Sequence, residues 1–328
     1  MTELAPNFSA PVPEPPDLAD TSACLKWLRE RYMKNARDTA LDDRLKEILE
    51  TDCDGKLTAM PQRNGLIQEV RGLLTFGDSR DGKTALLARN LIRQPLIGLS
   101  YGTEPGRALY IKTPPDASLK GVAMHILKKT GYPEVNPRIR THEAWDEVVH
   151  RLDMRGFTIL WLDEAHHMFE RSGEVKAVLR RLKNIMQGNQ AILLILSGIP
   201  SLDTIVRRDP ETSERLIRLR LGGLKGSDER ADLLRFLKTC GLMIKVSLPD
   251  DPHLMDRLDF ANGGSLGLIV ENTYSAMGRA MRRGDRAVTL EDFAKYAEQK
   301  KGYADQEGPF EPGDWPTLQK VLEQRGWA

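Results

Sequence analysis

Residues 77–84, "GDSRDGKT", have types and spacing that suit phosphate binding. They match the pattern G-x-x-x-x-G-K-[ST], in which glycines let successive backbone N–H groups turn toward phosphate oxygens. Lys83 is placed to reach the outer phosphates of a nucleotide, and Thr84 to ligate magnesium. We therefore predict that this loop binds ATP and Mg²⁺, with Arg80 offsetting the two acids inside the motif. The predicted nucleotide contacts are Gly77, Asp78, Ser79, Arg80, Asp81, Gly82, Lys83, Thr84 and Ala85.

A second motif, "FTILWLDEAHH", places two carboxylates directly after an apolar run. At a strand end, Asp163 can hold the water shell of a magnesium ion, and Glu164 can accept a proton from an attacking water. The adjacent His166 and His167 raise the possibility of a further metal site. Because neighbouring residues on a helix point in different directions, we expect the two histidines to be polar neighbours of the site instead.

Two more segments contain candidate site residues. In "LLILSGIPSL", Ser197 and Ser201 can contact a terminal phosphate or orient water, or can simply cap a helix. In "IVRRDPETSERLIRLRL", Arg215 precedes a strand-like alternation. An arginine there can stabilise the charge of a neighbouring subunit's nucleotide, or can be a solvated surface residue.

The elements that must position these residues alternate between strands and helices from about residue 66 to 222. Short apolar runs predict strands in "LIQEVRGLLTFG", "RALYIKT", "FTILWLD" and "AILLILSG", with helical patterns such as "ALLARNLIRQP" and "DASLKGVAMHILKKTGY" between them. This order predicts an α/β fold with a parallel sheet flanked by helices, where ligands bind outside the carboxyl ends of the strands. Beyond residue 223 the patterns are helical only, which indicates a separate small helical domain.

These patterns divide the chain into four parts. Residues 1–20 are a Pro-rich, flexible arm, and residues 21–222 are the nucleotide-binding domain, beginning with two helices or one interrupted helix. Residues 223–302 form the helical domain. Residues 303–328 form a tail in which three of the aromatic residues either dock a partner or pack onto the chain's own domain. These aromatic residues are Phe310, Trp315 and Trp327.

The composition limits which partners, cysteine chemistry and cellular location the sequence is compatible with. Lys and Arg number 48 and Asp and Glu 47, so attraction to nucleic acid must come from local patches rather than from net charge. The three cysteines follow no metal-ligand spacing, which is typical of a reducing cytoplasm without disulfides or structural zinc. No apolar stretch approaches the roughly 20 residues of a membrane span, and the N-terminus lacks the pattern of a signal peptide. We expect a cytoplasmic protein that does not enter a membrane.

Together, the phosphate loop, the Asp-Glu strand, the serine strand end and the C-terminal helices resemble a P-loop AAA+ ATPase with a small helical lid. Over residues 25–290, the segments "ALYIKTPPDASLKGVAMHILKKTGYP", "ILWLDEAHHMF" and "LLILSGIPSL" resemble the TniB and TnsC type of transposition regulator, related in role to the phage Mu B protein. The resemblance implies an ATPase that assembles as rings or filaments on double-stranded target DNA. It also implies a transposase, which the protein recruits or activates, and target-selector proteins as partners.

Carried over to single residues, the resemblance assigns ATP and magnesium to Gly77, Gly82, Lys83 and Thr84, and hydrolysis to Asp163 and Glu164. It assigns a phosphate-sensor role to Ser197 and the arginine-finger role to Arg215. Four lysines lie where relatives of this type approach the DNA backbone, and phosphate contacts need only positive charge. These are Lys112, Lys120, Lys128 and Lys129.

The helical domain departs from the wider AAA+ pattern, because "GGSLGLIVENTY" has no arginine where many relatives carry a second sensor. Slow hydrolysis, suited to a timing switch that controls assembly lifetime, is the expected result. Two other functions stay open: a replication-type AAA+ initiator or helicase loader, and a nucleotide-gated protein scaffold. A superfamily 2 helicase is disfavoured, since no second RecA-like domain follows the first.

Overall fold

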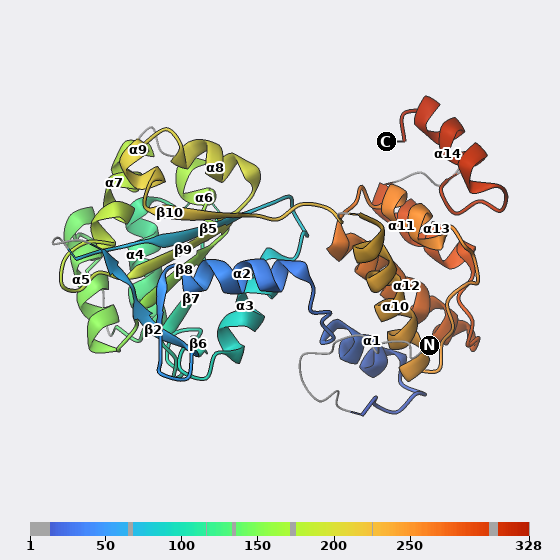
Figure 1. Ribbon diagram of the computed structural model, residues 1–328, viewed down its shortest axis with the longest axis horizontal. Helices are drawn as coiled ribbons and strands as arrows, with labels where there is room; N and C mark the ends of the chain where they lie inside the picture. The colour runs from blue at the N-terminus through green and yellow to red at the C-terminus, as the bar shows by residue number, and fades with distance from the viewer. Residues whose placement is uncertain are drawn as a thin grey trace. The chain divides into compact units, whose positions relative to one another are not determined.

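The computed structural model describes residues 14–64, 68–115, 117–132, 136–170, 175–224, 226–301 and 308–327 (Figure 1). The chain divides into two compact units, one of residues 36–221 and one that joins residues 1–35 to 222–328. Most of the predicted Pro-rich arm, residues 1–13, lies outside the described residues. In the described ranges, no helix has both the length and the apolar composition to cross a bilayer.

A six-stranded sheet with every pairing parallel forms the centre of the unit 36–221. Its spatial order is β10-β5-β9-β8-β7-β6. The strands are β5 (Gly72–Phe76), β6 (Leu99–Ser100), β7 (Ala108–Lys112), β8 (Ile159–Asp163), β9 (Leu193–Gly198) and β10 (Leu216–Arg220). The predicted α/β fold with a parallel sheet is confirmed. The sequence patterns missed β6, which is only two residues long.

The sheet has a core on each face, because successive residues of a strand point to opposite sides. In β8, Leu160 and Leu162 belong to one buried cluster, and Ile159 and Trp161 belong to the other. This explains why the central strands read as continuous apolar runs: both of their faces are covered.

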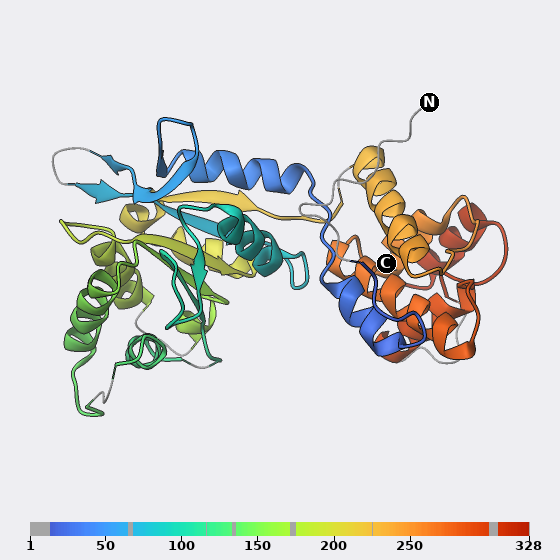
Figure 2. The same cartoon turned by 90° about the horizontal axis from the view of Figure 1, so that it is seen from below.

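Helices cover both faces of the sheet, as Figure 2 shows with α2 on one side and the green helices on the other. One face packs against α2 (Ala36–Lys46) and α3 (Lys83–Arg93). The other face packs against α4 (Leu119–Lys129), α5 (Thr141–Met154), α7 (Val175–Ile185) and α8 (Pro200–Val206). The remaining elements of this unit are the short helices α6 (His167–Glu170) and α9 (Pro210–Ser213) and the strands β1 (Leu49–Thr51), β2 (Leu57–Pro61), β3 (Arg63–Asn64) and β4 (Glu69–Val70). The small strands form two antiparallel pairs, β1-β2 and β3-β4.

The second unit is helical and has its own core. Its helices are α1 (Thr21–Arg29), α10 (Gly226–Met243), α11 (Leu254–Ala261), α12 (Leu266–Arg283), α13 (Leu290–Lys301) and α14 (Trp315–Gln324). Grouping α1 with the nucleotide-binding domain was wrong. Its apolar face, Cys24, Trp27 and Leu28, is buried in the core of the helical unit, where α1 packs on α12.

The C-terminal segment packs back onto this helical unit. Phe310 is buried and stacks on Phe293 of α13, with ring centroids 5.4 Å apart. Trp315 is buried and meets Phe260 edge to face. The guanidinium of Arg257, itself buried, donates to the carbonyl oxygens of Pro309, Glu311 and Gly313 at 2.8–3.0 Å. The aromatic tail therefore packs onto its own domain, which is one of the two alternatives predicted from the sequence.

Candidate functional site

The phosphate-binding motif forms a tight turn between β5 and α3. Arg80 and Gly82 have left-handed backbone conformations, with φ of 70° and 83°. Gly77 accepts no side chain, because a Cβ there would lie 2.6 Å from the carbonyl oxygen of Leu221. Gly82 precedes α3 and supplies no side-chain cap, so the first N–H groups of this helix are left for another acceptor. A helix start of this kind attracts anions through its N–H groups and its dipole.

Inside the loop, backbone groups hold two of the charged side chains, those of Lys83 and Asp81. The Lys83 ammonium is buried and donates to the carbonyl oxygens of Gly77 at 3.0 Å and Asp78 at 2.7 Å. The N–H of Asp78 donates to the Asp81 carboxylate at 2.8 Å. Burial raises the pKa of Asp81 above its usual range. Arg37 on α2 donates to the Asp81 carbonyl at 3.1 Å, a contact from 44 residues away that the local motif could not predict.

Three hydroxyl groups converge on the carboxylate of Asp163. Thr84 donates to one oxygen at 2.8 Å, and Tyr110 of β7 donates to the same oxygen at 3.2 Å. Ser197 of β9 donates to the other oxygen at 2.5 Å. The groups meet because β7, β8 and β9 are neighbours in a parallel sheet, so their carboxyl ends share one edge. Hard oxygen donors beside a phosphate loop are the ligands that Mg²⁺ prefers, so Thr84 and Asp163 fit the predicted magnesium site.

The indole of Trp161 also holds the Ser197 side chain in place. Trp161 donates its Nε1 hydrogen to the Ser197 hydroxyl at 2.8 Å, and both side chains are fully buried. Tyr110 packs edge-on against Trp161, with centroids 4.6 Å apart. Burial and the neighbouring Asp163 carboxylate raise the pKa of Tyr110, so its hydroxyl remains a proton donor. Tyr110 and Trp161 were missed as site residues, because their roles depend on a strand register that no local pattern gives.

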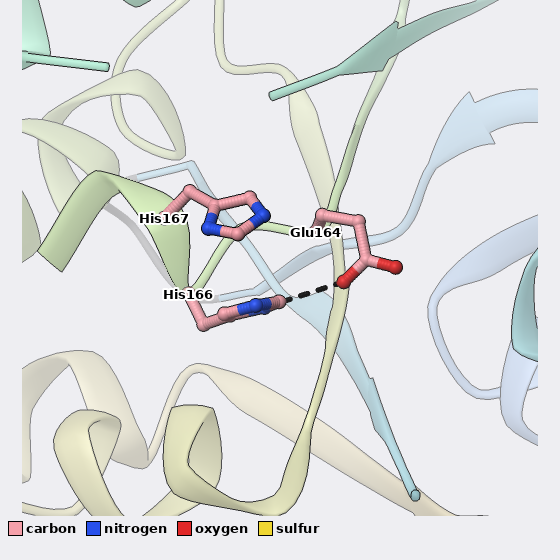
Figure 3. A group of neighbouring side chains, drawn as sticks. All are labelled: Glu164, His166 and His167. Atoms are coloured by element: carbon pink, nitrogen blue, oxygen red, sulfur yellow. Dashed lines mark ion pairs between the residues drawn. The ribbon is translucent and has the colours of Figure 1, made fainter. Parts of the chain in front are cut away.

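Glu164 lies in a strained turn beside two histidines (Figure 3). Its φ is 52°, an uncommon value for a residue with a side chain. Its carboxylate oxygen is 3.4 Å from Nδ1 of His166. The expectation that the two imidazoles diverge is wrong, because α6 begins only at His167 and His166 lies in the turn before it. Their ring centroids are 4.2 Å apart.

Arg215 is not part of this site. It directly precedes β10, whose first residue pairs with Gly72 at the start of β5, whereas the phosphate loop follows the end of β5. Four residue steps along β5 span about 13 Å. Arg215 therefore lies where the strands begin, at the end of the sheet opposite the phosphate loop. There it forms an ion pair with Glu69 at 2.5 Å. A role for Arg215 at its own chain's nucleotide is therefore excluded, and the predicted role at a neighbour's nucleotide remains a prediction.

The four predicted DNA-contacting lysines fall into two groups. Lys112 and Lys129 line one open cavity of about 280 Å³, together with Tyr101, Tyr110 and His125. Lys120 instead donates to the carbonyl of Pro137 at 2.7 Å. Lys128 neighbours Lys129 on α4 but does not line the cavity. Tyr110, which lies in the cavity wall, donates a hydrogen bond to Asp163.

Comparisons with known proteins agree with this architecture. The profile of the family described as "Bacterial TniB protein" matches residues 23–225. Among solved structures, the ORC2 protein of Aeropyrum pernix in its ADPNP–ADP complexes is similar at a TM-score of 0.56 and 14% identity, covering 89% of this chain and 72% of that one. Cdc6p of Pyrobaculum aerophilum is similar at 0.52 and 16% identity, covering 89% and 69%. At these identities the likeness shows the fold alone, which is that of the P-loop AAA+ ATPases. The curated proteins include no significant match.

Proposed function

Because the chain belongs to the TniB family, we propose that it is an ATP-hydrolysing transposition regulator that assembles on target DNA and recruits or activates a transposase. The observation that carries the hydrolytic part is the contact of Thr84 with Asp163 at 2.8 Å, which joins the phosphate loop to the acidic strand end. The transposition part is supported by the family membership.

In this proposal each residue has a definite task. Lys83 and the start of α3 hold the phosphates, and Thr84 with Asp163 holds Mg²⁺, which neutralises phosphate charge when it is bound. Glu164 follows Asp163 directly and orients and deprotonates the attacking water. Ser197 and Tyr110 act through Asp163, since their hydroxyl hydrogens keep the carboxylate in one orientation.

The proposal includes oligomerisation, because the chain's own site contains no arginine finger among the residues described. Arg215 is too far from its own phosphate loop and is the finger we assign to a neighbouring subunit's nucleotide. An ATPase of this design is active only when assembled. Hydrolysis then limits the lifetime of the assembly, which suits a regulator.

For DNA, we propose that Lys112 and Lys129 contact backbone phosphates. Both lie at the tyrosine-lined cavity, where a phosphate would be close to Tyr110 and, through it, to Asp163. Such contacts need no base-specific pattern and weaken as salt rises. The alternative client, a replication origin or helicase, uses the same nucleotide chemistry and is equally compatible with the fold. The proposal of transposition rests on the family membership.

Electron microscopy and sedimentation with a non-hydrolysable ATP analogue, with and without duplex DNA, test this function. We expect rings or filaments that need both nucleotide and DNA, grow with duplex length and dissolve when ATP is hydrolysed. Assembly that ignores DNA would support a protein scaffold instead. A discrete complex that saturates at one short sequence would support the replication-type alternative. Lys129→Glu should weaken assembly on DNA more than Lys128→Glu, its matched neighbour outside the cavity.

A further inference from the structure

The histidine pair next to Glu164 has the geometry of a metal site that is separate from the magnesium site. Glu164, His166 and His167 each offer one ligand atom, and these atoms lie within 4.8 Å of one another. Zinc bonds of about 2.1 Å in tetrahedral geometry separate two ligand atoms by about 3.4 Å. Glu164 Oε2 and His166 Nδ1 are already 3.4 Å apart. Figure 3 shows the His167 ring extending over His166 toward Glu164.

His166 supplies an independent indication of a ligand. The residue is 6% exposed, and its Nδ1 has no hydrogen-bond partner within the described part of the chain, since the approach to Glu164 lacks hydrogen-bond geometry. A buried polar atom without a partner is unfavourable unless something binds it. Imidazole nitrogens are common ligands of zinc-class ions, so this nitrogen is a candidate ligand atom.

His167 has the surroundings of a metal-binding histidine. Its Nδ1 is 3.0 Å from a carboxylate oxygen of Glu170. Histidines that bind metal through one ring nitrogen commonly hold a carboxylate on the other, which fixes the tautomer and raises the basicity of the binding nitrogen. The His167 side chain is also 23% exposed, which gives an ion a way in from solvent.

We propose that Glu164, His166 and His167 bind one divalent transition-metal ion of the zinc class, and that the bound ion stops ATP hydrolysis by occupying the Glu164 carboxylate. Two imidazoles and a carboxylate favour zinc-class ions over Mg²⁺, which prefers oxygen ligands. The second half of the proposal rests on the proposed role of Glu164 in hydrolysis, and the first half does not.

Titration of the nucleotide-free protein with Co²⁺, followed by its visible absorption and by displacement with Zn²⁺, tests the site. A Cys53→Ser background removes the exposed thiol as a competing ligand. We expect one equivalent to bind, with affinity reduced at least about tenfold in His166→Ala and His167→Ala and about 10- to 100-fold in Glu170→Gln. His150→Ala, an exposed histidine on α5, is the matched control and should bind as the parent does. Equal affinity in all variants, or no saturable binding, would overturn the site.

The coupling to hydrolysis is tested separately by measuring ATP turnover at saturating Mg²⁺ with and without Zn²⁺. Each variant is compared with its own zinc-free rate. We expect at least about tenfold inhibition of the parent protein and clearly weaker inhibition of His167→Ala. Cobalt binding without inhibition of turnover would overturn the coupling. All rates are measured with duplex DNA present, because the proposed assembly needs it. If turnover is absent even with DNA and without zinc, the proposed function fails, and the cobalt titration still decides whether the site exists.

Discussion

Replacing Ser197 by alanine tests the hydrogen-bond arrangement behind Asp163. In the folded protein the Ser197 hydroxyl donates to Asp163 and accepts from Trp161, and all three side chains are buried. Ser197→Ala removes a hydrogen bond to a charged group, worth about 1.5–3 kcal/mol, and leaves the indole N–H without its partner, at about 1–3 kcal/mol. Because the neighbouring groups can relax, we expect the free energy of unfolding to fall by about 3 kcal/mol.

For a unit of this size, such a loss lowers the midpoint of thermal unfolding by roughly 6–12 °C. Differential scanning calorimetry of the wild type and Ser197→Ala measures it. Ser201→Ala, on the exposed side of α8, is the matched control and should unfold within about 0.5 kcal/mol of the wild type. In a Trp161→Phe background, Ser197→Ala should cost about 1–2 kcal/mol less, since the indole donor is already gone.

If Ser197→Ala unfolds like the wild type but loses ATP turnover, the hydroxyl faces the nucleotide as a phosphate sensor and is not engaged with Asp163. A double-mutant cycle without coupling between Ser197 and Trp161 would contradict the 2.8 Å contact between them.

Three further predictions concern other parts of the chain. Tyr110→Phe should reduce the free energy of unfolding by about 1 kcal/mol, measured by denaturation. It should also raise the Mg²⁺ concentration needed for half-maximal turnover, measured by magnesium titration. Unchanged values in both measurements would contradict the Tyr110–Asp163 bond. Arg257→Ala should speed limited proteolysis of the segment 308–327 at least about tenfold, because three hydrogen bonds to carbonyl oxygens are lost. The substitution Lys320→Ala, at an exposed residue, should leave the rate of proteolysis unchanged. Equal cleavage of the two variants would show that the Arg257 guanidinium does not anchor the tail. At pH 8, Cys53 should react with a disulfide reagent rapidly and Cys240 only on unfolding, because burial raises the Cys240 pKa to about 11 and keeps its thiol protonated; fast reaction of Cys240 in the folded protein would contradict its burial.

The sequence was sufficient for features that depend on local residue order. The phosphate loop, the five longer strands and the Asp-Glu strand end follow from motif spacing and apolar runs, because a strand buried on both faces must be apolar throughout. Parallel order then places Thr84, Asp163 and Ser197 at one edge of the sheet. This is where the structure has them.

Features that depend on tertiary contacts were missed or misread. Amphipathic spacing shows that one face of α1 is buried, but not that Cys24 and Trp27 pack in the helical unit. Arg37 reaches the phosphate loop only because α2 packs on α3. The histidine pair was misread through a helix boundary, since the start of α6 at His167 leaves His166 in a turn where the two rings can approach.

In the proposed function, residues 77–84 and the Asp163–Glu164 pair form one ATP-hydrolysing site. Binding of a fluorescent ATP analogue and release of phosphate in the presence of duplex DNA test this site when they are measured side by side on Lys83→Ala, Glu164→Gln and the exposed control Lys176→Ala. We predict that Lys83→Ala loses binding, that Glu164→Gln binds ATP but turns it over at least about 100-fold more slowly, and that Lys176→Ala matches the wild type. Wild-type turnover by Glu164→Gln, or wild-type binding by Lys83→Ala, would contradict the account.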